Sequence, residues 1–165
     1  MKTVSVYFTS DAELVKDCGG TVATQRQMPA SETGVARKSL EMLFDGPTTA
    51  EQAKGLKGSF TGWNEVLKSV SAKDETVYVN FTKELLNQKG KYWVGNFGSS
   101  CGSGSWEQIR KTAGQFPNIK YVVFSIDDNP AKWTEFVWGT TCEERLTNAG
   151  SDPFIQKQCG TVIPK

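Results

Sequence analysis

The side chains that could do chemistry in this chain are carboxylates and cysteines, because its 165 residues include no histidine. Without histidine, Ser-His and Cys-His nucleophile pairs are excluded, and the commonest metal ligand is missing. Acid–base catalysis would fall to carboxylates, lysine or tyrosine with shifted pKa values. A glycoside hydrolase, for example, needs two carboxylates roughly 5–10 Å apart across a cleft. The candidates for such a pair are Glu84, Glu107, Asp127, Glu135, Glu143 and Glu144.

Nothing in the spacing of these carboxylates pairs them, and solvation at the surface is the ordinary state of such residues. Asp127-Asp128-Asn129 could supply oxygen ligands for calcium, but it matches no complete calcium loop, and a turn that ends a strand explains it. The Gly- and Ser-rich segment 95–105 lacks the Gly-Lys-Ser/Thr ending of a phosphate-binding loop. We therefore predict no catalytic, metal or cofactor site, and no enzyme.

The four cysteines, Cys18, Cys101, Cys142 and Cys159, favour disulfides over a metal site. A four-cysteine zinc site usually contains two closely spaced pairs, and none is present here. Two disulfides would place the protein in an oxidising compartment; four buried thiols in a cytosolic protein are the alternative. A bond between Cys142 and Cys159 would close a short loop in the C-terminal part of the chain.

Charge and hydropathy exclude several classes of partner. A formal net charge of +1 and a pI near 7.6 argue against nucleic acid, whose binders carry a basic excess on one face. No apolar run approaches the roughly 18 residues of a membrane span. We expect no transmembrane segment in this chain. The chain starts without a signal peptide, so an exported protein would be a mature or trimmed form, or anchored through a segment outside this sequence.

Aromatic side chains are the remaining candidates for binding. Tyr92, Trp93 and Phe97 belong to a Gly-, Ser- and aromatic-rich segment, 87–104, which we expect to be a long loop. Exposed rings there could contact a partner protein or stack on sugar rings, because binding residues are common on loops. Burial of these rings in the core is the alternative.

Hydrophobic periodicity predicts the elements that would position these residues. Strands are expected at 4–9, 21–28, 66–72, 76–81 and 119–126. A first helix should start at Glu32 after a Ser31 cap and end at Gly46, and a second should start at Ser105 in a capping box with Gln108. An α/β fold with a single mixed β-sheet and two helices packed on one face would bury both helix stripes. We expect one domain over 1–130, with residues 131–165 an irregular, disulfide-linked extension packed on it.

Three short segments, in the right order, share a family pattern: 40–48 (LEMLFDGPT) with Glu51 and Gly55, 77–81 (VYVNF), and 108–127 from QIRKT through QFP to VVFSID. Together they resemble GerMN domains, which are sporulation and spore-germination modules of bacterial envelope proteins. The resemblance covers residues 4–128. Asn80 stands where the family usually has Asp, and Asp128-Asn129 replace its terminal Gly.

The resemblance implies a fold similar to ring-building motifs, and a secreted or lipid-anchored protein without enzymatic activity. Such a module would act outside the cytoplasm and mediate protein association in the cell envelope. A carbohydrate- or peptidoglycan-binding module is the alternative, so the expected partner is an envelope protein or cell-wall glycan. Cys18 and Cys101 resemble a cysteine pair of some family members, which implies a disulfide between them.

We predict the two disulfides Cys18–Cys101 and Cys142–Cys159. In the chain-entropy model, each is worth about 2–5 kcal/mol of stability. Peptide mapping without reduction checks the pairing. Four free thiols, or Cys18 joined to a cysteine near the C-terminus, would show the assignment to be wrong.

Overall fold

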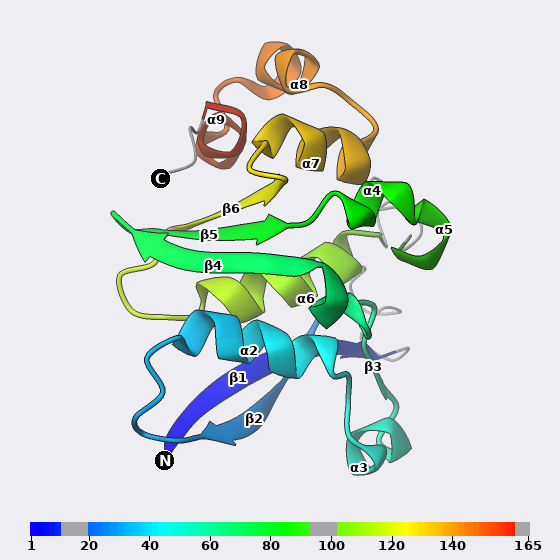
Figure 1. Ribbon diagram of the computed structural model, residues 1–165, viewed down its shortest axis with the longest axis vertical. Helices are drawn as coiled ribbons and strands as arrows, with labels where there is room; N and C mark the ends of the chain where they lie inside the picture. The colour runs from blue at the N-terminus through cyan, green and yellow to red at the C-terminus, as the bar shows by residue number, and fades with distance from the viewer. Residues whose placement is uncertain (11–19, 93–101, 161–165) are drawn as a thin grey trace. The chain divides into compact units, whose positions relative to one another are not determined.

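A computed structural model describes residues 1–10, 20–92 and 102–160 (Figure 1). Strands and helices mix along the chain, which confirms the α/β class. The chain forms two compact units, Met1–Glu65 with Tyr92–Phe116 and Val66–Lys91 with Pro117–Lys165. The described strands form two three-stranded sheets, so the prediction of a single sheet is wrong. Alternation identifies a strand but does not identify its partner.

The sheet of the first unit has the order β2-β1-β3. Strand β1 (Lys2–Ser10) pairs antiparallel with β2 (Val22–Met28), from Lys2 opposite Met28 to Phe8 opposite Val22. The short strand β3 (Leu56–Lys57) pairs with the end of β1. Val4, Val6 and Phe8 alternate along β1 and are all buried, which fixes the register of this strand.

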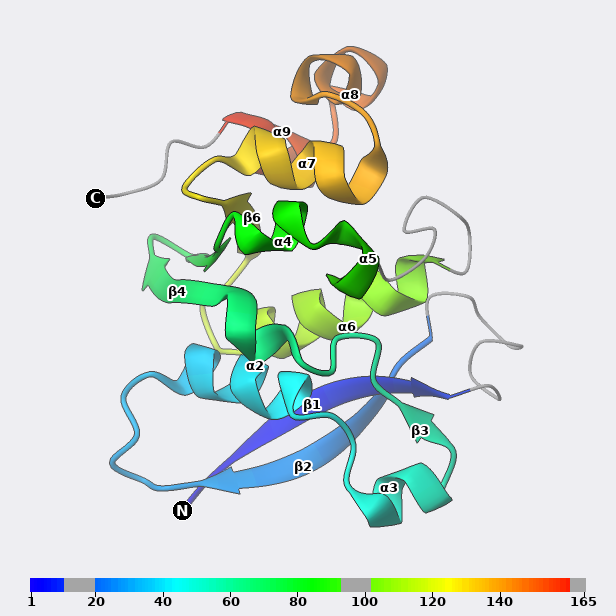
Figure 2. The same ribbon diagram turned by 45° about the vertical axis from the view of Figure 1, so that its right-hand side comes forward.

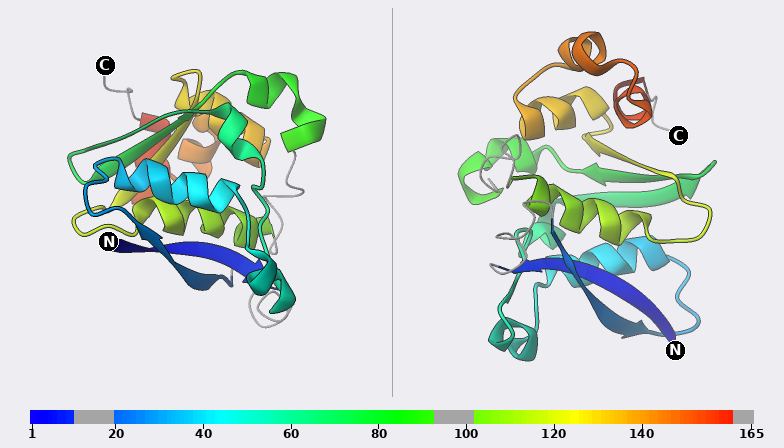
Figure 3. Two further views of the ribbon diagram at one scale, coloured as in Figure 1. Left: turned by 60° about the horizontal axis from the view of Figure 1, so that its bottom comes forward. Right: turned by 180° about the vertical axis from the view of Figure 1, so that it is seen from behind.

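Helices α2 (Val35–Phe44) and α6 (Gly102–Gly114) pack against β1 and against each other, as Figure 3 shows. Their core residues fall at helical spacing and are completely or almost completely buried: Leu40, Leu43, Phe44, Ile109 and Ala113. The unit also contains α3 (Thr49–Ala53) and most of the 3-10 helix η1 (Trp63–Val66). The predicted arrangement of two helices packed on a sheet is therefore found in the first unit.

Both predicted helix starts differ from the structure. Helix α2 begins three residues late, at Val35, because Glu32 donates its N–H to Pro29 and its carboxylate accepts the N–H of Gly34. Helix α6 begins before Ser105, whose hydroxyl bonds to the hydroxyl of Ser59. Gln108 accepts the Ser59 N–H and donates to its hydroxyl, so the apparent capping box makes tertiary hydrogen bonds instead.

The sheet of the second unit has the order β4-β5-β6. Strands β4 (Leu67–Lys73) and β5 (Thr76–Phe81) form the predicted hairpin, and β6 (Tyr121–Ile126) pairs parallel with β5. The hairpin turns through Asp74 and Glu75, both at positive φ, as a two-residue turn requires. All of β5 is buried, as expected of the central strand.

The C-terminal part is helical, so the prediction of an irregular extension is wrong. It contains α7 (Pro130–Trp138), α8 (Cys142–Ala149) and α9 (Pro153–Gly160) (Figure 2). Asn129 caps α7, with Pro130 at its first position, and Thr141 forms a capping box with Glu144 at the start of α8. The predicted boundary between the domain and its C-terminal extension falls at the start of α7, and the division of the chain into these two parts stays a prediction.

These helices are attached to the sheet of their own unit. Helices α7 and α9 pack against β6. Trp133 of α7 is buried and stacks on Phe81 and Phe124, with ring centroids 5.2 and 5.0 Å apart. The disulfide Cys142–Cys159, with its Cα atoms 5.3 Å apart, joins α8 to α9 as predicted. The second unit is completed by α4 (Glu84–Asn87) and most of α5 (Lys89–Tyr92), which lie where a loop was expected.

We predict that Gly46→Val lowers the free energy of unfolding by about 2–5 kcal/mol. Gly46 follows α2 at φ +85, where a β-branched residue is strained, and an added Cβ would lie 2.9 Å from the Thr61 hydroxyl oxygen. Gly55→Val is the matched control, because Gly55 has φ +86 with open space around it. It should cost only about 1–2 kcal/mol. Urea denaturation measures both, and equal losses would contradict the contact with Thr61.

Candidate protein interaction site

Tyr92, expected in an exposed aromatic cluster, is buried instead. It is 3 % exposed, its ring lies edge-on to Trp63 with centroids 6.0 Å apart, and its hydroxyl donates to Glu65 at 3.0 Å. Trp63 also contacts Phe44 and Phe60, so Tyr92 extends an aromatic core. The expectation of an exposed Tyr92 is therefore wrong, whereas Trp93 and Phe97 lie outside the described residues.

The candidate carboxylates take part in local contacts or are solvated. Glu107 forms an ion pair with Arg110, and Glu84 accepts from Asn87 and Gln88. The Glu144 carboxylate accepts the backbone N–H of Thr141 in the N-terminal cap of α8, and Glu135 is exposed. In the described ranges, no group of three or more acidic or cysteine side chains is close enough to hold a metal ion.

The turn after β6 accounts for the acidic pair that could have bound calcium. Asp127 and Asp128 have φ 51 and 62, and Ile126 and Asn129 exchange backbone hydrogen bonds around them, which makes a tight strand-ending turn. Lys68 reaches both carboxylates, at 3.5 and 3.3 Å. The hydrogen bond to Asp128 is the main cause that raises the pKa of Lys68 above its usual value.

The side chain of the buried Asn80 makes three hydrogen bonds in the same place. Its side-chain carbonyl accepts from the Ser125 hydroxyl at 2.8 Å and from the Asp128 N–H at 3.0 Å, and its amide donates to Asp128. An asparagine can donate and accept in this way, whereas an aspartate here would face the Asp128 carboxylate. Asn80 therefore holds the ends of β5 and β6 together.

The cysteines divide between described and undescribed residues. Cys142 and Cys159 are joined to each other, which leaves no four-cysteine zinc site. Cys18 and Cys101 lie outside the described residues, and their disulfide stays a prediction.

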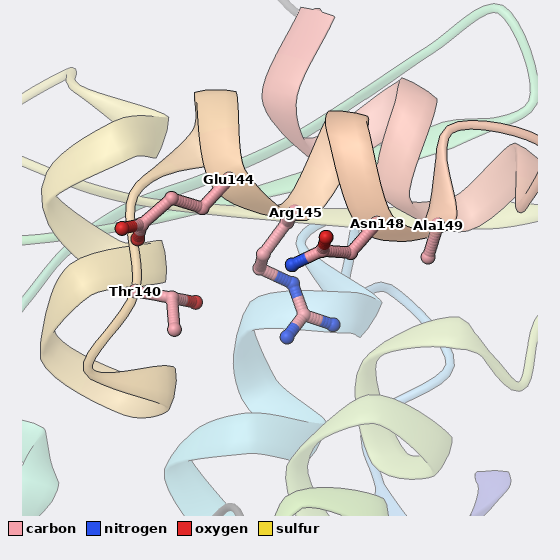
Figure 4. Close-up of a pocket in the computed structure, with 5 residues that line it drawn as sticks. All are labelled: Thr140, Glu144, Arg145, Asn148 and Ala149. Atoms are coloured by element: carbon pink, nitrogen blue, oxygen red, sulfur yellow. The ribbon is translucent and has the colours of Figure 1, made fainter.

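A small open hollow of about 130 Å³ lies along α8 (Figure 4). It is lined by Thr140, Glu144, Arg145, Asn148 and Ala149. Glu144 is bound to the N-terminus of its own helix, and the guanidinium of Arg145 lies over the Trp138 ring, 4.6 Å from its centroid. The polar groups of this hollow thus serve the helix and do not converge on a ligand.

Sheet edges are the surfaces on which a partner strand could add, because they carry unpaired backbone groups. Two of the four outer edges are sealed by side chains. On β6, the Gln158 amide accepts the N–H of Phe124 at 2.9 Å and donates to its carbonyl at 2.6 Å. The glutamine side chain thus replaces the peptide group of a further strand.

The same arrangement seals β1 on the side away from β2. The Gln115 amide accepts the N–H of Ser5 and donates to its carbonyl, both at 2.7 Å. Thr112 accepts the N–H of Tyr7 at 3.1 Å. Together with β3, these side chains of α6 and its C-terminal end close this edge.

Strand β4 is the outer strand of its sheet, but it carries features that discourage strand addition. Its exposed residues include Lys68 and Lys73, and its pairing with β5 shifts register between Leu67 and Ser69. Edge lysines and bulges of this kind protect sheets against pairing with other chains.

Strand β2 lacks these protective features. Within the described part of the chain it pairs with β1 alone, in continuous register over seven residues. Its one charged residue, Arg26, forms an ion pair with Glu51 and lies over the Phe8 ring. The edge of β2 is therefore long, regular and effectively neutral, which makes it the candidate interaction site.

Comparison with known sequences gives the family. The family described as "Germane: Sporulation and spore germination" matches residues 5–132. The chain belongs to this family. All three motif segments lie within the matched range, so the resemblance to GerMN domains inferred from them is confirmed.

Two solved structures of the family resemble this chain. The tandem GerMN domains of the sporulation protein GerM from Bacillus subtilis have 17 % identity and a TM-score of 0.49, covering 77 % of this chain and 39 % of that one. The first GerMN domain of GerM has 19 % identity and a TM-score of 0.45, covering 78 % and 85 %. The chain thus spans well under half of the tandem-domain structure. No curated protein matches it.

We predict that the Arg26–Glu51 pair makes stability fall in acid. The hydrogen bonds from Arg26 are the main cause that lowers the pKa of Glu51 to about 2, and the Glu51 side chain is 14 % exposed. Because the folded-state pKa lies below the ordinary value of 4.5, this contribution is complete above about pH 4.5 and is lost as the pH falls towards 2.

Urea denaturation between pH 7 and pH 2 measures this contribution. The difference in unfolding free energy between the wild type and Glu51→Gln should be constant at neutral pH and shrink below about pH 4.5. Glu135→Gln, at an exposed position, is the control and should show no such trend. A difference that does not depend on pH would contradict the pair.

Proposed function

We propose that this member of the sporulation and spore germination family is a non-catalytic module for protein association in the cell envelope. It acts outside the cytoplasm, either secreted or anchored through a segment outside this chain. The observation that carries the proposal is the edge of β2, which is regular, uncharged overall and paired on one side only among the described residues. An edge of this kind accepts an extended segment of another protein through backbone hydrogen bonds.

Three further observations support the proposal. The disulfide Cys142–Cys159 suits an oxidising compartment. Within the described ranges, the carboxylates that a hydrolase would need serve caps and ion pairs or are solvated. No helix in that part of the chain has the length and apolar character to cross a bilayer.

The carbohydrate- or peptidoglycan-binding alternative has lost part of its basis. It required an exposed aromatic platform, and Tyr92 is buried. The aromatic side chain with the highest relative exposure among the described residues is Phe154, at 54 %, and its ring meets that of Tyr121 edge-on with centroids 5.6 Å apart. Single exposed rings of this kind are ordinary at protein surfaces.

The test compares binding to envelope proteins with binding to cell-wall glycan. The disulfide-intact chain is crosslinked in an envelope extract and, in parallel, sedimented with purified peptidoglycan. We expect protein adducts that Gln25→Lys, on β2, reduces at least about tenfold, because a charge at an edge opposes strand addition. Ser71→Lys, at an exposed position of β4, is the matched control and should leave the adducts unchanged.

Two results would contradict the proposal. Sedimentation with peptidoglycan in the absence of protein adducts would favour the glycan-binding alternative. Turnover of peptidoglycan fragments that is lost when one carboxylate is changed would show the chain to be an enzyme.

A further inference from the structure

The backbone groups that β2 presents at its edge follow from the contacts of β1. The N–H groups of Ser5 and Tyr7 point away from β2, since Gln115 and Thr112 accept them. The even-numbered residues of β1 therefore make the hydrogen bonds to β2, because backbone groups alternate in direction along a strand. The backbone N–H and C=O groups of their partners, Thr24 and Arg26, therefore point towards β1. Those of Ala23, Gln25 and Gln27 point away from β1, to the outer edge of the sheet.

From this edge, and resting on the proposed function, we propose that two copies of this chain associate through antiparallel pairing of β2 with β2, about a twofold axis at Gln25. Gln25 is the central residue of Val22–Met28. A twofold axis there pairs Gln25 with Gln25 of the second copy and Ala23 with Gln27. Each pair consists of residues whose backbone groups point outward, so both hydrogen bonds of every pair can form.

The side chains are self-complementary in this register. Ala23, Gln25 and Gln27 are all exposed, and the small Ala23 stands opposite the longer Gln27. Each Gln25 amide donates one N–H to the Ser5 hydroxyl, at 3.1 Å. Its second N–H and its carbonyl meet the same groups of the second copy, and an amide is complementary to an amide.

Charge distinguishes β2 from the other outer strand. On the opposite face of β2, Thr24 would stand across from Arg26, whose charge is balanced by Glu51 within its own chain. No two like charges then oppose each other. Pairing through β4 would bring the exposed Lys68 and Lys73 to the interface beside a register shift. A second copy therefore fits β2. The pairing would join the β2-β1-β3 sheets of the two copies into one continuous sheet.

The association is expected to be weak. Pairing of one strand from each copy buries less than the roughly 1,200 Å² of a stable complex, and affinity comes mainly from the backbone bonds. We expect a dimer that forms at concentrations from tens of micromolar upward, and that rearranges no element of the fold.

Sedimentation velocity of the disulfide-intact chain, from about 10 µM to about 1 mM, tests the dimer in this expected range. Gln25→Lys should weaken it at least tenfold, because two lysines would then face each other at the twofold axis. The control Ser71→Lys should leave it unchanged. Thermal melts establish that both variants fold.

Amide hydrogen exchange by NMR tests the strand pairing without any substitution. The amides of Ala23, Gln25 and Gln27 should exchange several-fold more slowly in a sample near about 1 mM than in a dilute one, whereas those of Thr24 and Arg26, already bonded to β1, should not change. A chain that is monomeric at about 1 mM, a dimer insensitive to Gln25→Lys, or a dimer without this alternation would each overturn the inference. If the chain is monomeric and Gln25→Lys still abolishes adducts with envelope proteins, the proposed function stands and the self-pairing alone fails.

Discussion

The constraint on which both units depend is that a three-stranded sheet has two edges, and each backbone N–H and C=O on them needs a partner, from the protein where the edge is covered and from water where it is exposed. Leaving such a group buried and unpaired costs about 1–3 kcal/mol. In each unit one edge is closed by a glutamine amide, Gln115 against Ser5 and Gln158 against Phe124. Each amide supplies one donor and one acceptor, as a peptide group does. Gln115, which directly follows α6, and Gln158, in α9, thereby fix these helices against the two strands.

Each of the two units also has its own set of hydrophobic contacts. In the first unit, α2 and α6 cover the buried face of β1. In the second, Trp133 stacks on Phe81 and Phe124, so that a residue after the family's last motif contributes to the core of the motif strands. Aromatic pairs of this geometry add about 0.5–1.5 kcal/mol each beyond their buried area. The helices after residue 130 are therefore part of the second unit's core.

Local features of the structure were predictable from the sequence, and long-range ones were not. Alternation found the strands and the hairpin at Asp74–Glu75, and the Gly46-Pro47 pair found the end of α2. The start of α6 was missed because serine and glutamine side chains can bond to distant groups as well as to a helix end: Gln108 binds Ser59, which is 49 residues away. The start of α2 was missed because Glu32 takes part in a local turn with Pro29 and Gly34. The three helices after Asn129 are too short to show a convincing stripe, although Thr141 and Glu144 do form a recognisable capping box. The sealed edges were beyond sequence reasoning, since Gln115 and Ser5 are 110 residues apart.

Gln158 also bears on how this protein behaves when it is shortened. The family match ends at residue 132, which invites the preparation of a fragment that stops there. Such a fragment would lack α9 and would leave the apolar strand β6 with an unsealed edge. A β-rich, uncharged segment like Tyr121–Ile126 with an open edge is the kind that nucleates aggregation. The residues beyond the family boundary thus cover the edge of β6 as well as completing the core around Trp133, and a version trimmed at residue 132 would lose both protection against aggregation and stability.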